Sequence, residues 1–133
     1  MRGSAIRYPL LNAIILGLAM LVSLPVAAFA HAAMVKSAPG KRAVLSQMPA
    51  RIELCFNEAV EIKFSSVRIA DRHETPLPLG ELVTGSDPKC LEAAISPAGP
   101  GVYSVQYRVL SLDGHVIESS YEFTVKPALP AQQ

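Results

Sequence analysis

The chain has 133 residues, half of them hydrophobic, and its 12 basic and 11 acidic side chains give a formal net charge of +1. This length accommodates one domain. The sequence shows neither a basic patch nor aromatic residues interleaved on a positive stripe, so it lacks the usual electrostatic footprint of DNA or RNA binding. We therefore expect no nucleic-acid partner.

Residues 1–30 have the three parts of a secretory signal peptide. Two arginines precede an uncharged, apolar run over residues 10–30, which ends in Ala28-Phe29-Ala30 with small residues at the two positions that signal peptidase reads. We expect cleavage after Ala30 and export of the mature chain. The alternative is a membrane anchor, because about 20 apolar residues can span a bilayer. Pro25 and the cleavage motif favour removal.

Cleavage would leave residues 31–133, enough for one small sandwich or barrel with a modest core. Two of the 12 basic residues and none of the 11 acidic residues lie in the signal peptide, so the mature side chains carry a net charge near −1. We expect the mature chain to be a monomer, with a folded domain over residues 31–125 and a flexible tail over residues 126–133.

The two cysteines, Cys55 and Cys90, would both be exported to an oxidising compartment, where a disulfide can persist. Closing the loop between them would contribute about 4 kcal/mol on the chain-entropy model, so we predict that they are bridged. The alternative is that they are thiolate ligands for Cu(I). Against it, the sequence offers no C-x-x-C motif and no Met or His neighbour at chelating spacing.

Short apolar alternations separated by Pro, Gly, Ser and Asp clusters predict an all-β domain after the signal peptide. The clearest alternation places Tyr103, Val105, Tyr107 and Val109 on one side of a strand. The segment 75–89 is rich in Pro and Gly, so we expect mostly loop there, with at most a short strand around Leu82 and Val83. The expected strands cover residues 31–36, 52–57, 64–70, 90–95, 103–109 and 120–125. This pattern indicates a small Greek-key β-sandwich or barrel of about seven strands.

Asp113-Gly114-His115 is the first motif with possible chemistry. Side chains two positions apart in an extended segment emerge on the same side, so the Asp113 carboxylate and the His115 imidazole would project together. Gly114 between them permits a bulge or an unusual backbone angle. The alternative is ordinary turn chemistry, in which Asp113 only closes a hairpin and His115 is a loop histidine bonded to the backbone.

Cleavage after Ala30 would make His31 the first residue of the mature chain. Its α-amine, with a reference pKa of about 8, and its ring Nδ1 can then close a six-membered chelate on one metal ion. Adding Asp113 and His115 gives three nitrogens and one oxygen, a set that suits the tetragonal preference of Cu(II). Zn(II) can use the same groups in tetrahedral geometry, so ligand type alone does not separate the two ions.

Several segments together resemble one known family. They are His31-Ala32-Ala33-Met34, Ser37-Ala38-Pro39, Leu54-Cys55-Phe56-Asn57-Glu58, the strand from Gly101 to Val109, and Ser111-Leu112-Asp113-Gly114-His115. They resemble the CopC-type periplasmic copper-binding proteins, including the PcoC group, and the resemblance runs from His31 to about Val125.

The resemblance implies a seven-stranded Greek-key barrel of cupredoxin-like or immunoglobulin-like appearance with a Cu(II) site. Matching residue by residue, His31, Asp113 and His115 would be its metal ligands. The implied role is a copper carrier or chaperone in copper homeostasis or resistance, not an enzyme. A CopD-type inner-membrane copper transporter is the implied partner.

Glu58 resembles an acidic residue that some members place near the copper as an outer-shell partner, although it could equally be a solvated charge at the end of a strand. Some members also carry a Met-rich Cu(I) site. Here only Met34 and Met48 follow residue 30, without an M-x-x-M or M-x-M cluster, so we expect no dedicated site of that kind.

The alternative function is a copper-dependent oxidoreductase built on an N-terminal histidine brace. Such enzymes use a second histidine where this chain offers an additional carboxylate, and a filled equatorial plane leaves little room for O₂. This departure favours binding over catalysis.

Overall fold

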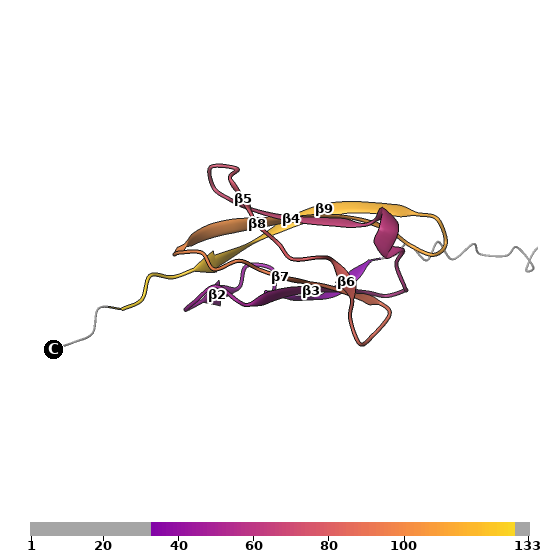
Figure 1. Ribbon diagram of the computed structural model, residues 1–133, viewed down its shortest axis with the longest axis horizontal. Coiled ribbons are helices and arrows are strands. Elements are labelled where there is room, and N and C mark those ends of the chain that lie inside the picture. The colour runs from indigo at the N-terminus through magenta and orange to yellow at the C-terminus, as the bar shows by residue number, and fades with distance from the viewer. Residues whose placement is uncertain (1–32, 130–133) are drawn as a thin grey trace, which may run out of the picture. The chain divides into compact units, whose positions relative to one another are not determined.

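Two β-sheets face each other in the computed structural model, which describes residues 33–129 (Figure 1). The four-stranded sheet has the order β1-β3-β7-β6, and the five-stranded sheet has the order β2-β9-β8-β4-β5. The elements are β1 (Met34–Ala38), β2 (Val44–Leu45), β3 (Arg51–Phe56), the 3₁₀ helix η1 (Ile62–Phe64), β4 (Ser66–Asp71), β5 (Pro76–Leu77), β6 (Val83–Thr84), β7 (Cys90–Ala94), β8 (Gly101–Leu110) and β9 (Val116–Val125). Neighbouring strands are antiparallel except β2 and β9, which pair in parallel.

The predicted all-β sandwich is therefore confirmed, with nine strands in the described residues where about seven were expected. Three of the nine, β2, β5 and β6, are only two residues long and lie at sheet edges. Such pieces exist because a neighbouring strand offers free backbone groups, and two residues carry no alternation of their own. The Pro- and Gly-rich segment 75–89 is mostly loop, as predicted, and its strand residues are those of β5 and β6.

Alternate side chains of both sheets fill the space between the layers. On β8, the predicted alternation holds, and the four residues at odd positions from Tyr103 to Val109 are all buried. Their counterparts in the other sheet include Ile52, Leu54 and Phe56 of β3. The rings of Phe56 and Tyr107 join the two layers edge to face, with centroids 5.8 Å apart, an arrangement that aromatic quadrupoles favour.

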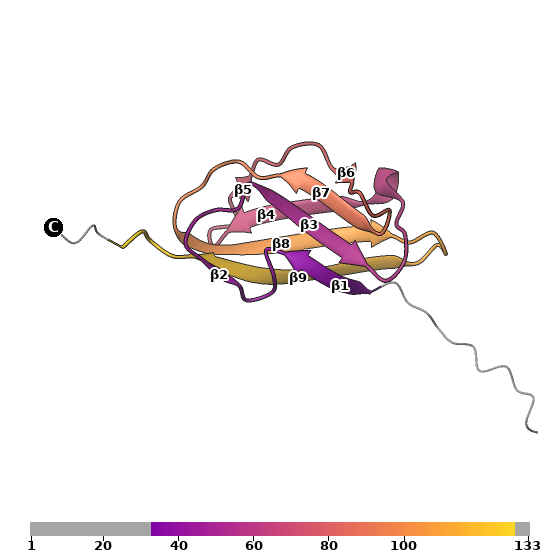
Figure 2. The ribbon, with the colours of Figure 1, turned by 90° about the horizontal axis from the view of Figure 1, so that it is seen from below.

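Strands β8 and β9 form a long hairpin whose register runs from Gly101↔Val125 to Leu110↔Val116. The loop that joins them, residues 111–115, holds the Asp-Gly-His motif. Figure 2 shows this loop at the end of the sandwich where β1 begins. The hairpin therefore presents the motif beside the start of the described chain.

The start of β9 was predicted wrongly, because the strand begins at Val116 and not near residue 120. Residues 116–120 pair with β8 along their whole length, but most of their side chains are exposed. A strand segment without a buried face has no apolar alternation by which it can be found.

Cys55 and Cys90 form the predicted disulfide, and no free cysteine occurs in the described residues. The two residues are direct register partners on β3 and β7. The covalent bond therefore joins the two central strands of the four-stranded sheet.

The expected signal peptide, residues 1–30, and the expected ligand His31 lie outside the described residues. Within residues 33–129, no helix has the length and apolar character needed to cross a membrane.

Candidate metal centre

The Asp-Gly-His motif lies in a tight turn and not in an extended segment as expected. The Ser111 N–H donates to the His115 carbonyl and the Gly114 N–H donates to the Ser111 carbonyl, each at 2.9 Å. Gly114 has a φ of +89°, a conformation that L side chains rarely adopt. The glycine thus lets the chain fold back so that Asp113 and His115 meet.

Asp113 and His115 contact each other directly in this turn. Nδ1 of His115 lies 2.8 Å from Oδ2 of Asp113, and the His115 backbone N–H donates to Oδ1 of Asp113 at 3.1 Å. Both side chains remain partly exposed, 52% for His115 and 37% for Asp113. With its proton on Nδ1 facing the carboxylate, the ring carries its lone pair on Nε2, the form in which histidine coordinates a metal.

Ser111 holds the Asp113 carboxylate in place through a hydrogen bond. It is 1% exposed, and its hydroxyl donates to Oδ1 of Asp113. This hydrogen bond, together with those from the backbone and ring of His115, lowers the pKa of Asp113 to about 2. At neutral pH the turn therefore carries a fixed negative charge beside an imidazole.

Glu58 lies on the segment that packs along this turn. Val60 bridges to Ser111, and the Leu112 N–H donates to the Ala59 carbonyl at 3.2 Å. Oε1 of Glu58 is buried and has no hydrogen-bond partner among the described residues. A buried carboxylate oxygen without a donor is costly, so this position suits a nearby cation.

Asn57 ties the start of the described chain to the same place. Its side-chain oxygen accepts from the Ala33 N–H at 2.7 Å, and its own N–H donates to the Ala33 carbonyl at 3.0 Å. Ala33 is thereby bonded to the residue that precedes Glu58, two positions before Ala59, which accepts a hydrogen bond from the 111–115 turn.

Among the predicted site residues, the structure brings Asp113 and His115 into contact and places Glu58 on the adjacent segment, whereas His31 lies outside the described part. Sequence reasoning gave Ser111 and Asn57 no role of their own, although both belong to the segments that carried the resemblance. Cys55 and Cys90 are not part of this cluster, since they form a disulfide on β3 and β7.

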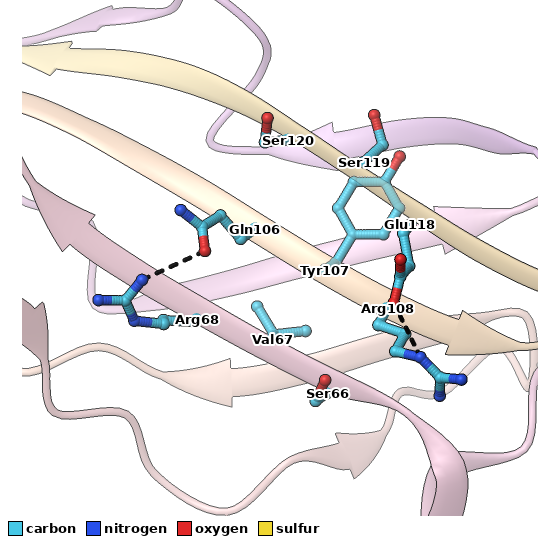
Figure 3. Close-up of a pocket in the computed structure, with 9 residues that line it drawn as sticks. All are labelled: Ser66, Val67, Arg68, Gln106, Tyr107, Arg108, Glu118, Ser119 and Ser120. Carbon is cyan, nitrogen blue, oxygen red and sulfur yellow. Dashed lines mark hydrogen bonds and ion pairs between the residues drawn. The ribbon is translucent and has the colours of Figure 1, made fainter. Parts of the chain in front are cut away.

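A surface depression lies elsewhere, over the outer face of β4, β8 and β9 (Figure 3). It occupies about 750 Å³. Arg68 and Gln106 are joined by a hydrogen bond of 3.2 Å there, and Arg108 and Glu118 by an ion pair of 2.9 Å. A single carboxylate already paired with arginine does not make a metal site, so this depression is separate from the candidate centre.

Comparison with known proteins decides the family. The family described as CopC domain matches residues 34–126. The chain belongs to the CopC family. It is 32% identical over 127 residues to Copper resistance protein C of Escherichia coli, covering 88% of this chain and 98% of that protein. The crystal structure of CopC from Methylosinus trichosporium OB3b is similar, with a TM-score of 0.70 and 32% identity, covering 77% of this chain and 100% of that one.

A further relative is a much longer protein. Copper transport protein CutJ of Bacillus subtilis is 31% identical over 120 residues, which cover 84% of this chain but only 21% of CutJ. The chain thus spans about a fifth of that protein. Membership of this family of copper resistance and copper transport proteins confirms the predicted family and fold, while the ligand set His31, Asp113 and His115 stays a prediction.

Proposed function

We propose that this protein binds Cu(II) in the periplasm and acts as a copper carrier or chaperone in copper homeostasis or resistance. The ionised Asp113 carboxylate against the His115 ring carries this conclusion, because it supplies charge and an oriented nitrogen donor at one exposed place. Membership of the CopC family supports copper as the cargo. The names of the relatives describe resistance and transport and not catalysis, which supports a binding role.

The remaining donors would come from the mature N-terminus. His31 precedes Ala33 by two residues, which an extended chain spans in about 7 Å. The Ala33–Asn57 hydrogen bonds hold Ala33 at the end of the sandwich where the turn lies. The His31 amine and ring, the His115 ring and the Asp113 carboxylate then make a set of three nitrogens and one oxygen, which suits Cu(II).

Glu58 would act on this centre from outside the ligand set. Its buried Oε1 lies on the segment beside the turn, and a second carboxylate charge there offsets part of the double positive charge of Cu(II). Asp113 in the turn and Glu58 on the adjacent segment would both favour a divalent cation at this end of the sandwich.

A carrier must pass its metal on, and a CopD-type inner-membrane copper transporter is the partner that we propose. The relation to CutJ supports this, since the matched segment there is joined to a much longer chain with a transport name. The partly exposed position of Asp113 and His115 leaves the site open to a docking acceptor.

A Cu(II) competition titration with His115→Ala tests the proposal, and His73→Ala is the matched control. His73 is an exposed histidine just beyond Asp71, which pairs with Tyr103 near the opposite end of β8. His115→Ala should weaken Cu(II) binding on the order of 100-fold, because a multidentate chelate loses a donor, while His73→Ala should not change it. Equal affinities of the two variants would refute the site.

A further inference from the structure

Cys55 and Cys90 lie on the outer face of the four-stranded sheet, away from the core. Side chains alternate along β3, and its core-facing residues are Ile52, Leu54 and Phe56. Cys55 and its neighbour Glu53 therefore point to the other side. Neither cysteine belongs to the hydrophobic cluster between the sheets, although each is only 7% exposed.

A surface cavity of about 450 Å³ opens onto this disulfide. Both cysteines line it, together with four charged side chains: Lys36, Glu53, Asp87 and Lys89. Nζ of Lys36 is 2.8 Å from Oε1 of Glu53, so that carboxylate is already paired with a cation. The cavity gives a small molecule or a partner's side chain a route to the two sulfurs.

The two sulfurs and a Glu53 oxygen all lie within 4.8 Å of one another, and in residues 33–129 this is the one group of three such donors at metal-binding spacing. The strand register alone brings the cysteines together, which explains why no C-x-x-C motif marks the pair. As a disulfide the sulfurs are not thiolate donors. Reduced, they become two soft donors side by side, the kind of ligand that selects Cu(I).

We propose that Cys55 and Cys90 form a redox-gated Cu(I) site, closed as the disulfide and opened by a dithiol reductant of the thioredoxin class. The reductant's two thiols become a disulfide as the Cys55–Cys90 bond breaks, and its two electrons and two protons pass to the cysteines. Cu(I) then binds both sulfurs and displaces the two protons. A disulfide oxidant reverses this step: it takes two electrons from the two bound thiolates and two protons from solvent to become a dithiol, the Cys55–Cys90 bond reforms, and Cu(I) is released.

The donor set favours Cu(I) over Zn(II), because two soft thiolates are the kind of ligand that selects Cu(I). The four charged side chains that line the cavity, two lysines and two carboxylates, cancel in net charge. Zn(II) would need further ligands such as Glu53, but that carboxylate is paired with Lys36. Glu53 thus positions a cation, and its hard oxygen is a poor ligand for Cu(I).

The two cysteines would supply soft ligands for Cu(I). Residues 31–133 otherwise offer only Met34 and Met48 and no methionine cluster. The site uses none of the residues proposed for Cu(II). A chain with both sites would hold the oxidised ion at the 111–115 turn and the reduced ion on β3 and β7, with the redox state of Cys55 and Cys90 deciding whether the second site exists.

An anaerobic Cu(I) competition titration against bicinchoninate tests the site. The chain is reduced with a phosphine, freed of reductant, and compared with the oxidised chain and with Cys55→Ser/Cys90→Ser, which also lacks the cross-link and so shares any effect of losing it. The reduced chain should bind one Cu(I) ion, and its affinity for that ion should be on the order of 100-fold higher than the Cu(I) affinity of either comparison sample. Equal Cu(I) affinities of the reduced chain and the double variant would overturn the site.

Two further measurements separate a folded site from loose thiols and from the Cu(II) site. Lys36→Ala should weaken Cu(I) binding about threefold, the size of a partly screened charge interaction, whereas Lys126→Ala, an exposed lysine after β9, should not. Equal affinities of these two variants would show that the folded cavity plays no part and would also overturn the site. His115→Ala should keep full Cu(I) affinity, so a failure of the Cu(II) proposal is distinguishable from a failure of this one.

Discussion

The Nδ1 atom of His115 lies 2.8 Å from Oδ2 of Asp113, across a turn that Gly114 closes with a positive φ. The contact gives the imidazole a defined orientation and leaves the carboxylate ionised. The pair places two of the three proposed metal ligands, a carboxylate and an imidazole, side by side in the metal-free chain.

The metal-free chain should lose part of its stability in acid through Asp113. The pKa of this group is about 2 in the folded chain, below its ordinary value of 3.8, so its ionised form stabilises the fold above pH 3.8. That contribution falls as the pH drops from 3.8 towards 2. Urea unfolding of metal-free wild type and Asp113→Asn should differ at pH 6 and converge near pH 2. A difference that stays constant over this range would contradict the ionised role of Asp113.

Gly114→Ala should lower the free energy of unfolding by about 1 kcal/mol, since alanine is strained at a φ of +89°. No atom lies within 4 Å of the added methyl group, so the cost is conformational and not steric. Gly99→Ala is the matched control, because its methyl group also meets nothing within 4 Å and its φ is not positive. Thermal unfolding of the two variants checks this, and equal melting temperatures would show that the turn tolerates a side chain.

Asn57→Ala should weaken Cu(II) binding about tenfold without removing a proposed ligand. The substitution deletes the acceptor that holds the Ala33 N–H at 2.7 Å. The N-terminal residues would then lose more conformational entropy when they bind the metal, which weakens binding. Asn57→Asp retains an oxygen acceptor and should restore most of the affinity. Isothermal titration with Cu(II) measures both affinities. An unchanged affinity in Asn57→Ala would show that the hydrogen bond to Ala33 does not contribute to Cu(II) binding.

Cys55→Ser/Cys90→Ser should lower the free energy of unfolding by about 4 kcal/mol, the entropic value of cross-linking residues 35 apart. The chain should still fold, because both cysteines lie outside the core cluster. Urea denaturation, fitted with one common m-value for the wild type and the variant, gives the difference in the free energy of unfolding. A loss below 1 kcal/mol would mean that the bond contributes little to the folded state.

The long elements of the fold could be predicted because their side chains divide between core and solvent. The residues at odd positions from Tyr103 to Val109 alternate with polar ones, and the structure buries them as expected. The first half of β9 and the two-residue strands could not be predicted, since pairing with a neighbour and not their own sequence defines them.

At the candidate site, the residue types could be predicted but the roles of their neighbours could not. The i, i+2 spacing of Asp113 and His115 does bring the two together, although through a turn and not an extended segment. The support from Ser111 depends on its burial beneath the turn, and the tie between Asn57 and Ala33 depends on strand pairing. Neither is encoded in local spacing.

The most direct test of the account is Cu(II) electron paramagnetic resonance on exported protein whose first residue has been fixed by intact mass, beside the same protein with one residue added before His31. We predict a start at His31 and a tetragonal signal with nitrogen splitting that changes in the extended chain and in His115→Ala. A different start residue, or spectra identical in all three proteins, would contradict a copper centre formed by the N-terminus and the Asp113–His115 pair.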